Sequence, residues 1–195
     1  MGGPIFDLAK LKWLNGRYLR EKLHPEEVVK RLQAWKANSD FIGKIMPLAL
    51  QRLETFSDFF PLAQFLLSEQ PDYGLETLTG KLQPDQPAKL LKIAEWELEK
   101  ASPWNRDTLS EIFQKIADME EIKLKQLMPL FFVAMSGTPV SLPLFDGLSL
   151  LGPDLARMRL RRALELLGES GNGLSKKGLK SLEKYYASRY GNRID

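Results

Sequence analysis

The chain has 195 residues, of which 44% are hydrophobic and 27% are charged, and its formal net charge is +3. This composition is typical of a globular protein that is long enough for one sizeable core or two smaller ones. The absence of cysteine excludes a disulfide framework and a thiolate metal site, and the longest apolar run, Leu127–Met135, is too short to span a bilayer.

The first third of the chain predicts helices and no strand. It begins with neither a secretory signal pattern nor a complete myristoylation motif, so we expect a cytoplasmic protein with no membrane partner. From Pro25 to Trp35 the spacing puts Val28 and Leu32 on one helix face, after a proline and two glutamates that suit a helix start. Further helices are predicted at residues 41–53 and 57–67.

Helix-breaking residues gather between residues 68 and 87, which predicts a seam between two helical units. Asp107 is expected to cap one of the helices beyond this seam, and Ser175 is expected to cap the last. The predicted helices of this half cover residues 87–100, 107–116, 124–135, 153–167 and 175–190.

These elements predict an all-α protein with two packed helical subdomains and a basic C-terminal helix. We place a junction segment before the first subdomain and a basic tail after the second. The predicted boundaries are 1–22 for the junction, 23–75 and 76–167 for the two subdomains, and 168–195 for the tail.

Positive charge is concentrated at the C-terminal end. Residues 157–193 contain ten basic and three acidic residues, a net charge of +7, so the remainder of the chain carries −4. Such asymmetry favours a polyanionic partner such as RNA, although a solvated helix face can have the same composition.

Three separated segments resemble bacterial glutamyl-tRNA synthetases. Residues 5–20, Ile-Phe-Asp-Leu-Ala-Lys-Leu-Lys-Trp-Leu-Asn-Gly-Arg-Tyr-Leu-Arg, are similar to that family's phrase "FDLxKLxWLNGxYIRE". Residues 123–137 are similar to its "KLGQVAQPLRVALTG", and residues 144–152 to its "LFEILALLG". The resemblance extends from residue 2 to about residue 167 and implies the C-terminal anticodon-binding region, separated from its catalytic half.

The resemblance implies a function for the parent enzyme, which would attach glutamate to its tRNA with ATP and Mg²⁺. Such an enzyme needs histidine-rich and lysine-rich elements that hold the ATP phosphates. The only histidine, His24, is expected to end a turn, and Leu174–Lys177 is expected to be a capped helix start. We therefore expect this region alone to hold no cofactor and to catalyse nothing. Its expected partners are tRNA and the catalytic domain of the parent, and it is expected to be a monomer.

Arg52, in Leu-Gln-Arg-Leu-Glu-Thr-Phe, lies where many family members have an arginine that recognises the cytosine ending glutamate anticodons. An arginine can donate to base acceptors in an unstacked loop. The alternative is a surface arginine that balances the negative end of a helix.

Phe132 lies where the family has an arginine that holds the first two anticodon bases. A phenylalanine can stack on a base but cannot donate to it, and we favour a place in the core. The proline-rich loop at residues 137–143 is the better candidate for holding these bases, although it can also be a plain connector between helices. The predicted anticodon-binding set is Arg52, Phe132, Ser141, Leu142, Pro143 and Leu144.

Contacts with the tRNA backbone are expected from arginines and lysines near both ends. The predicted residues are Arg17, Arg20, Arg157, Arg161, Arg162, Lys176 and Lys177. Asn15-Gly16 is expected to break a helix, and Trp13 and Leu14 are candidate core residues. The tyrosines at 185, 186 and 190 can stack on RNA or, more commonly, dock on their own domain.

Two alternatives to this interpretation stay open. The chain can be a free-standing helical adaptor that binds protein through its apolar faces, and the basic C-terminus argues against this only weakly. It can also be a family member whose specificity is shifted toward glutamine tRNA, which Phe132 motivates.

Overall fold

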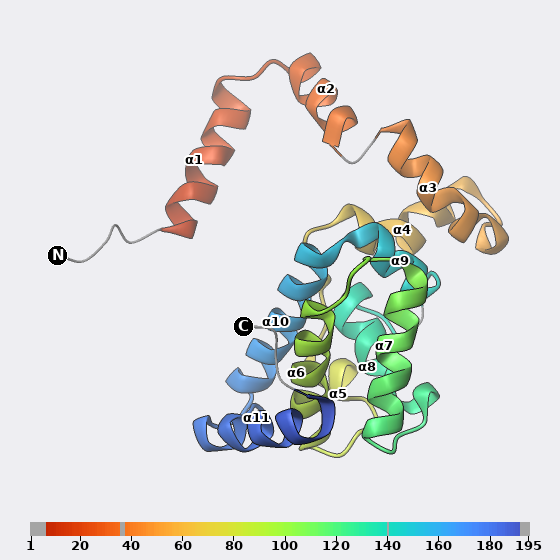
Figure 1. The fold of residues 1–195 in the computed structure, drawn as a ribbon. Coiled ribbons are helices and arrows are strands. Elements are labelled where there is room, and N and C mark those ends of the chain that lie inside the picture. Colours follow the sequence, from red (N-terminus) through yellow and green to blue (C-terminus); the bar gives the residue numbers. More distant parts are fainter. Residues whose placement is uncertain (1–6, 36–37, 140, 192–195) are drawn as a thin grey trace. The chain divides into compact units, whose positions relative to one another are not determined.

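The structure is a computed structural model that describes residues 7–35, 38–139 and 141–191 (Figure 1). These residues form eleven α-helices, two short 3-10 helices and no strand, which confirms the predicted all-α fold. By the proximity of their Cα atoms, residues 1–44 and 45–195 form two compact units, and the boundary falls within α3 (Ser39–Ala49).

The first unit contains α1 (Leu8–Glu21), α2 (Pro25–Trp35) and the start of α3. Asp7 caps α1 by accepting a hydrogen bond from the main-chain N–H of Lys10 at 3.0 Å. The predicted bounds of α2 are confirmed, and the carbonyl of His24 accepts from the N–H groups of Glu27 and Val28 at 3.0 and 3.1 Å.

Two expectations about α1 are wrong. The helix runs without a break through Asn15-Gly16, because an interior glycine costs only about 1 kcal/mol, which the strong helix formers around it can offset. Trp13 and Leu14, which were candidates for the core, are both exposed.

The second unit contains the rest of the chain. Its elements are the end of α3, η1 (Leu50–Arg52), η2 (Phe56–Asp58), α4 (Phe59–Leu67), α5 (Leu75–Thr79), α6 (Gln86–Glu99), α7 (Arg106–Met119), α8 (Leu124–Ser136), α9 (Leu144–Leu151), α10 (Pro153–Glu169) and α11 (Lys176–Tyr190).

The core of this unit lies among α6, α7, α8 and α10. Helix α6 packs on α7 and α10, and α8 packs on α4, α5, α7 and α10 (Figure 1). The apolar run Leu127–Met135 lies in α8 and supplies much of this core, as the sequence predicts. On α10 the predicted stripe is largely confirmed, since Leu160, Ala163 and Leu167 are buried and Leu164 is half-buried.

The segment 68–87, predicted as a seam, lies inside the second unit. It contains α5, which packs against both α8 and α10. The subdomain boundaries drawn from the sequence stay a prediction.

The two predicted helix caps have different outcomes. Ser175 caps α11, and its hydroxyl accepts from the N–H of Gly178 at 3.0 Å, as predicted. Helix α7 begins one residue before Asp107, and its cap is Asn105, whose side-chain oxygen accepts from the N–H of Thr108 at 2.9 Å. Asp107 therefore lies in the first helical turn, where its charge still complements the helix dipole.

Candidate nucleic-acid interface

Arg52 contacts the loop at residues 137–143, which the sequence predicts to hold other bases of the anticodon. It ends η1, its side chain is exposed, and its Nη1 group donates to the main-chain carbonyl of Ser141. The two residues are 89 positions apart in the chain. The fold thus brings together an exposed guanidinium and the loop at 137–143, which sequence spacing alone does not predict.

The turn that follows Arg52 is held by one carboxylate. Oδ2 of Asp58 accepts from the main-chain N–H of Thr55 at 2.6 Å and of Glu54 at 3.0 Å, closing a capping box at the start of η2. These backbone hydrogen bonds lower the pKa of the Asp58 carboxyl. The backbone from Arg52 to Asp58 therefore has a defined geometry although it is exposed.

The loop after α8 begins at a glycine that the structure requires. Gly137 has φ +83°, and a Cβ there would lie 3.0 Å from the carbonyl oxygen of Asp72 and 3.1 Å from Cβ of Pro71. The hydroxyl of Ser136 donates to the carbonyls of Phe132 and Thr138 at 2.8 and 3.1 Å. Residue 140 lies outside the described part of the chain.

The other predicted anticodon-binding residues are largely turned inward. Leu142 and Leu144 are buried, so their side chains belong to the core and can offer RNA only their main chain. Phe132 and Pro143 are half-buried, and the carbonyl of Pro143 accepts from the N–H of Gly147 at 2.9 Å. Only Arg52 of this set has an exposed side chain, and Ser141 is half-buried.

A buried arginine joins the ends of α4 and α8. It is one of the ten basic residues that give residues 157–193 their positive charge. Arg159 is fully buried, and its guanidinium donates to main-chain carbonyls only. The acceptors are Glu69 at 3.1 Å, Phe65 at 2.6 Å, Ser68 at 2.7 Å, and Met135. Burial lowers its pKa to about 10, so it remains charged at neutral pH.

Both helices direct their C-terminal carbonyls at this cation, and the partial negative charge there stabilises it. Arg159 thereby fixes the end of α8, from which the loop at 137–143 departs. One signal in the sequence could have revealed this role. Arg159 follows Ala156 by three residues and precedes Ala163 by four, which places it on the buried stripe of α10.

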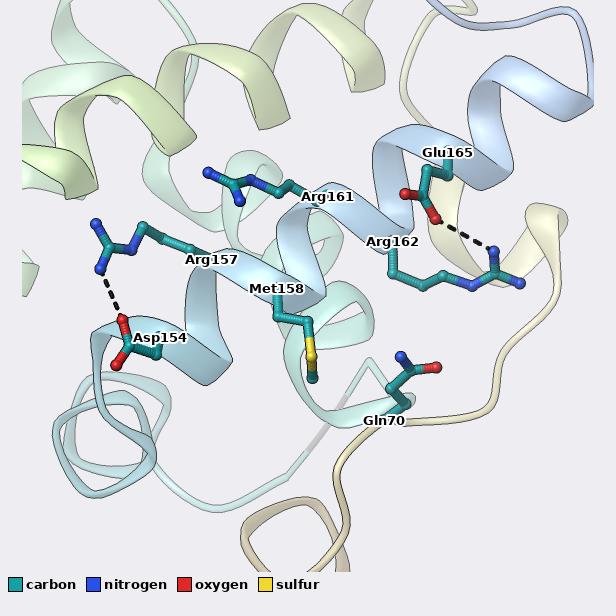
Figure 2. Close-up of a pocket in the computed structure, with 7 residues that line it drawn as sticks. All are labelled: Gln70, Asp154, Arg157, Met158, Arg161, Arg162 and Glu165. Carbon is teal, nitrogen blue, oxygen red and sulfur yellow. Dashed lines mark hydrogen bonds and ion pairs between the residues drawn. The ribbon is translucent and has the colours of Figure 1, made fainter. Parts of the chain in front are cut away.

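The three α10 arginines predicted to contact tRNA line one hollow of about 560 Å³ (Figure 2). Each of them pairs with a carboxylate of the protein. Arg157 meets Asp154 at 2.8 Å, and Arg162 meets Glu165 at 3.4 Å. Arg161 meets the buried Glu95 at 2.9 Å.

The pairs of Arg157 and Arg162 have exposed carboxylates, and such pairs contribute roughly 0 to 1 kcal/mol. A phosphate can therefore replace the carboxylate at low cost. Arg161 is different, because its carboxylate partner, Glu95, is buried and is shared with Lys92 at 2.6 Å, so removing one of the two cations would be unfavourable.

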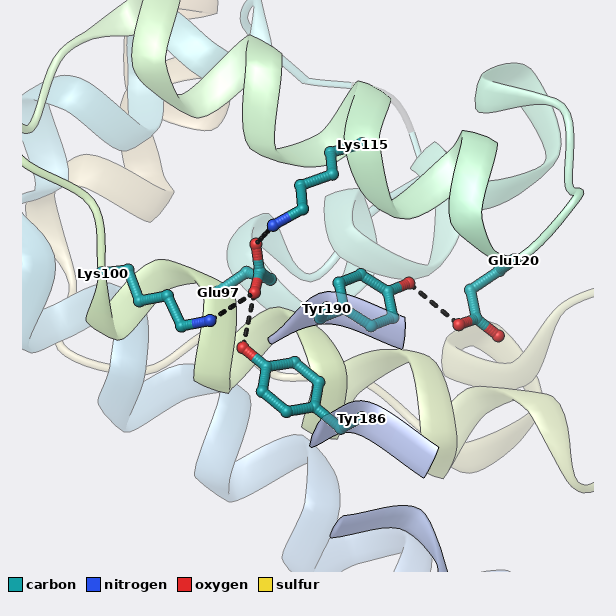
Figure 3. A network of polar contacts seen from close by, with 6 residues as sticks. All are labelled: Glu97, Lys100, Lys115, Glu120, Tyr186 and Tyr190. Carbon is teal, nitrogen blue, oxygen red and sulfur yellow. Dashed lines mark hydrogen bonds and ion pairs between the residues drawn. The ribbon is translucent and has the colours of Figure 1, made fainter. Parts of the chain in front are cut away.

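Helix α11 docks on α6 and α7 through tyrosines (Figure 3). The hydroxyl of the buried Tyr186 donates to Oε1 of Glu97, which also receives Lys100 at 3.0 Å, while Lys115 donates to Oε2 at 2.8 Å. Tyr190 and Tyr185 both donate to Glu120, at 2.9 and 3.0 Å. The docking interpretation is thus confirmed for Tyr186 and Tyr190, which are buried.

The opposite face of α11 carries four lysines. Leu182, Tyr186 and Tyr190 recur every four residues on the docked side, so helical geometry puts the lysines on the solvent side. They are all exposed and form no ion pair with the described residues. We call Lys176, Lys177, Lys180 and Lys184 the lysine face.

In the first unit, Arg17 and Arg20 are exposed on α1. Arg17 forms an ion pair with Glu21 at 2.7 Å, and its guanidinium lies 5.2 Å from the ring centre of Trp13. Among the residues that the structure describes, no helix could cross a membrane, and no group of three or more potential metal ligands is found.

A family model described as "Anticodon binding domain" matches residues 26–164. A glutamate–tRNA ligase of Ectopseudomonas mendocina is 42% identical over 189 residues, which cover 96% of this chain and 37% of the relative. That of Marinobacter nauticus is 40% identical over 96% of this chain and 38% of its own length. The chain therefore spans little more than a third of the curated relatives it matches.

The fold also resembles a solved structure. A crystal structure of a glutamate tRNA ligase from Elizabethkingia meningosepticum, in complex with its amino acid, matches with a TM-score of 0.59. The match covers 85% of this chain and 34% of the other, at 19% sequence identity, and at that identity it shows a shared fold only.

Proposed function

This chain belongs to the anticodon-binding domain family, and on that premise we propose that it binds tRNA and reads the anticodon for a glutamate–tRNA ligase. The observation that carries the proposal is the contact between Arg52 and the carbonyl of Ser141. It joins an exposed guanidinium to the loop at 137–143, in a chain that is homologous to glutamate–tRNA ligases over 96% of its length.

The chemistry of this contact suits base reading. The bond to Ser141 engages one terminal nitrogen of the guanidinium and leaves its other N–H groups available for the acceptors of a base. Unpaired loop bases expose the edges that carry these acceptors. Arg52 reads the base that ends the anticodon, and the main chain of the loop holds its neighbours.

Positive charge at other sites positions the RNA. The lysine face is exposed and has no ion pair among the described residues, so it meets phosphates without first losing a protein partner. Arg157 and Arg162 can exchange their exposed carboxylates for phosphates, and Arg17 and Arg20 supply contacts from α1.

The longer protein, in this proposal, activates glutamate with ATP and Mg²⁺ and transfers it to the tRNA. The curated relatives are glutamate–tRNA ligases of which this chain spans little more than a third. The catalytic steps belong to the remainder of such a protein. The residues described above contribute RNA binding and the choice of tRNA, and the chain is expected to act as a monomer in the cytoplasm.

Replacing Arg52 with glutamine tests the reading role. Two anticodon stem-loops that differ only in cytosine or guanine at the last anticodon base are titrated with the native and Arg52→Gln proteins. Loss of a base contact should reduce discrimination between them by roughly 1 to 3 kcal/mol, the scale of a good base contact. An unchanged affinity ratio would remove Arg52 from the reading site.

Arg106→Gln is the matched control, because Arg106 is an exposed arginine of the same unit. It should weaken both stem-loops equally or not at all, as expected for a residue that does not touch a base. The same titration decides between glutamate and glutamine specificity, which Phe132 puts in question. A native preference for the guanine-ended loop would favour glutamine.

A further inference from the structure

The exposed large apolar side chains described in the second unit fall within residues 50–60, the segment that contains Arg52. Among the described residues from 45 onward, the large apolar side chains that stay exposed are Leu50, Phe56 and Phe60. Phe56 is 97% exposed, Phe60 68% and Leu50 64%. Apolar groups gathered in one short segment mark a contact surface more often than scattered ones do.

The Phe56 ring is presented by a rigid backbone. Phe56 is the first residue of η2, and the Asp58 carboxylate holds the two main-chain N–H groups immediately before it. Its own carbonyl accepts from the N–H of Phe59. Because this backbone is already held, a flat partner that binds the ring has to order only the two side-chain torsions of Phe56.

The nearby Arg52 determines which kind of flat partner fits the Phe56 ring. Arg52 lies four residues before Phe56, and Asp58 holds the main-chain N–H groups of Glu54 and Thr55 between them. A cation and an exposed aromatic ring in one short segment suit an unpaired nucleobase, which has a π face for the ring and an anionic backbone for the cation. An apolar protein face would cover the ring but would leave the guanidinium of Arg52 without a partner of opposite charge.

We propose that Phe56 is a stacking platform for one unpaired base of the tRNA anticodon loop, next to the base that Arg52 reads. This inference rests on the proposed function and deepens it by adding a residue to the binding surface. Phe60 is less exposed, and its ring already meets the ring of Phe59 edge-on at 5.7 Å, so it serves as the comparison for Phe56.

The test is a titration of this chain with an anticodon stem-loop that carries the fluorescent base 2-aminopurine at each loop position in turn. Phe56→Leu keeps an apolar side chain but removes the π face, and it should weaken binding about tenfold. Phe56→Tyr keeps the ring and should bind as the native chain does. At one loop position, stacking should quench the fluorescence with the native and tyrosine proteins but not with leucine.

Phe60→Leu is the matched control, and it should bind with native affinity. Thermal unfolding checks that all three variants are folded, which their exposed positions favour. If Phe56→Leu binds as tightly as the native chain, the platform is wrong. It is also wrong if the leucine variants at 56 and 60 lose affinity equally. A third contrary outcome is that Phe56→Leu changes the mass measured by sedimentation, because Phe56 then contacts a second copy of the protein and not RNA. If the native chain binds no stem-loop, the proposed function itself fails.

Discussion

Helices α10 and α11 carry most of the positive charge at the C-terminal end, and they use it in different ways. The arginines of α10 bind the protein itself: one is buried against carbonyls, and three pair with carboxylates. The lysines of α11 face solvent. The planar guanidinium can serve several acceptors at once, whereas an ammonium group is strongly hydrated and stays in water. The net charge of +7 therefore overstates the charge that is free to meet RNA.

The largest effect is expected at Arg159. Replacing it with methionine fills similar space but leaves four main-chain carbonyls at the ends of α4 and α8 without their donor. Unsatisfied buried groups are costly, so we expect the free energy of unfolding to fall by about 3 kcal/mol or more, measured by urea denaturation. The control is Arg162→Met on the same helix, which should change it by less than about 0.5 kcal/mol. Equal losses of unfolding free energy in the two variants would show that the burial of Arg159 does not make it more important for stability than Arg162.

The next effect concerns the docking of α11. Tyr186→Phe removes the hydrogen bond to the buried Glu97 and keeps the ring, which lies 4.8 Å from the ring of Trp96. A hydrogen bond to a charged group is worth about 2 kcal/mol, so urea denaturation should show a loss of that size. Tyr185→Phe, in a half-buried position, should cost less. The opposite order would mean that Glu120 and not Glu97 anchors the helix.

Acid should weaken the same anchor. Burial opposes the charge of Glu97, but hydrogen bonds from Lys115, Tyr186 and Lys100 outweigh it and hold its pKa below the usual 4.5. A lowered folded pKa contributes stability above the unfolded value, and that contribution is lost as the pH falls through the folded pKa. The difference in unfolding free energy between the native chain and Glu97→Gln should therefore be largest above pH 4.5 and shrink below it. A difference that grows on acidification would contradict this assignment.

Substitutions in the lysine face are expected to have the smallest effect on stability but a clear effect on tRNA binding. Replacing its four lysines with glutamine should change unfolding by less than about 0.5 kcal/mol, because they are exposed. It should also flatten the dependence of tRNA affinity on salt, since each lost phosphate contact lowers that slope by about one unit. Arg161→Gln is the contrast, and it should change the slope less per charge because Arg161 is held by the buried carboxylate of Glu95. If each lost charge changed the slope equally in the lysine variant and in Arg161→Gln, the lysines of α11 would be no more available to RNA than the arginines of α10.

The sequence by itself determined the helices, because their signals are local. Apolar spacing and caps such as Ser175 predicted the fold class and most helix bounds, and three short motifs indicated the family. Local signals also misled where two options lay close in energy, as at Asn15-Gly16, where a glycine within a helix is affordable.

Only the tertiary structure decided which of these side chains are available to a partner. The spacing along α10 hints that Arg159 lies on the buried stripe, but only the packing brings the ends of α4 and α8 to this arginine and leaves Arg162 exposed. Arg52 meets Ser141 across 89 residues, Leu142 turns into the core, and Phe56 stays outside it. Burial and long-range contact depend on how distant helices pack, and no local pattern of residues encodes that arrangement.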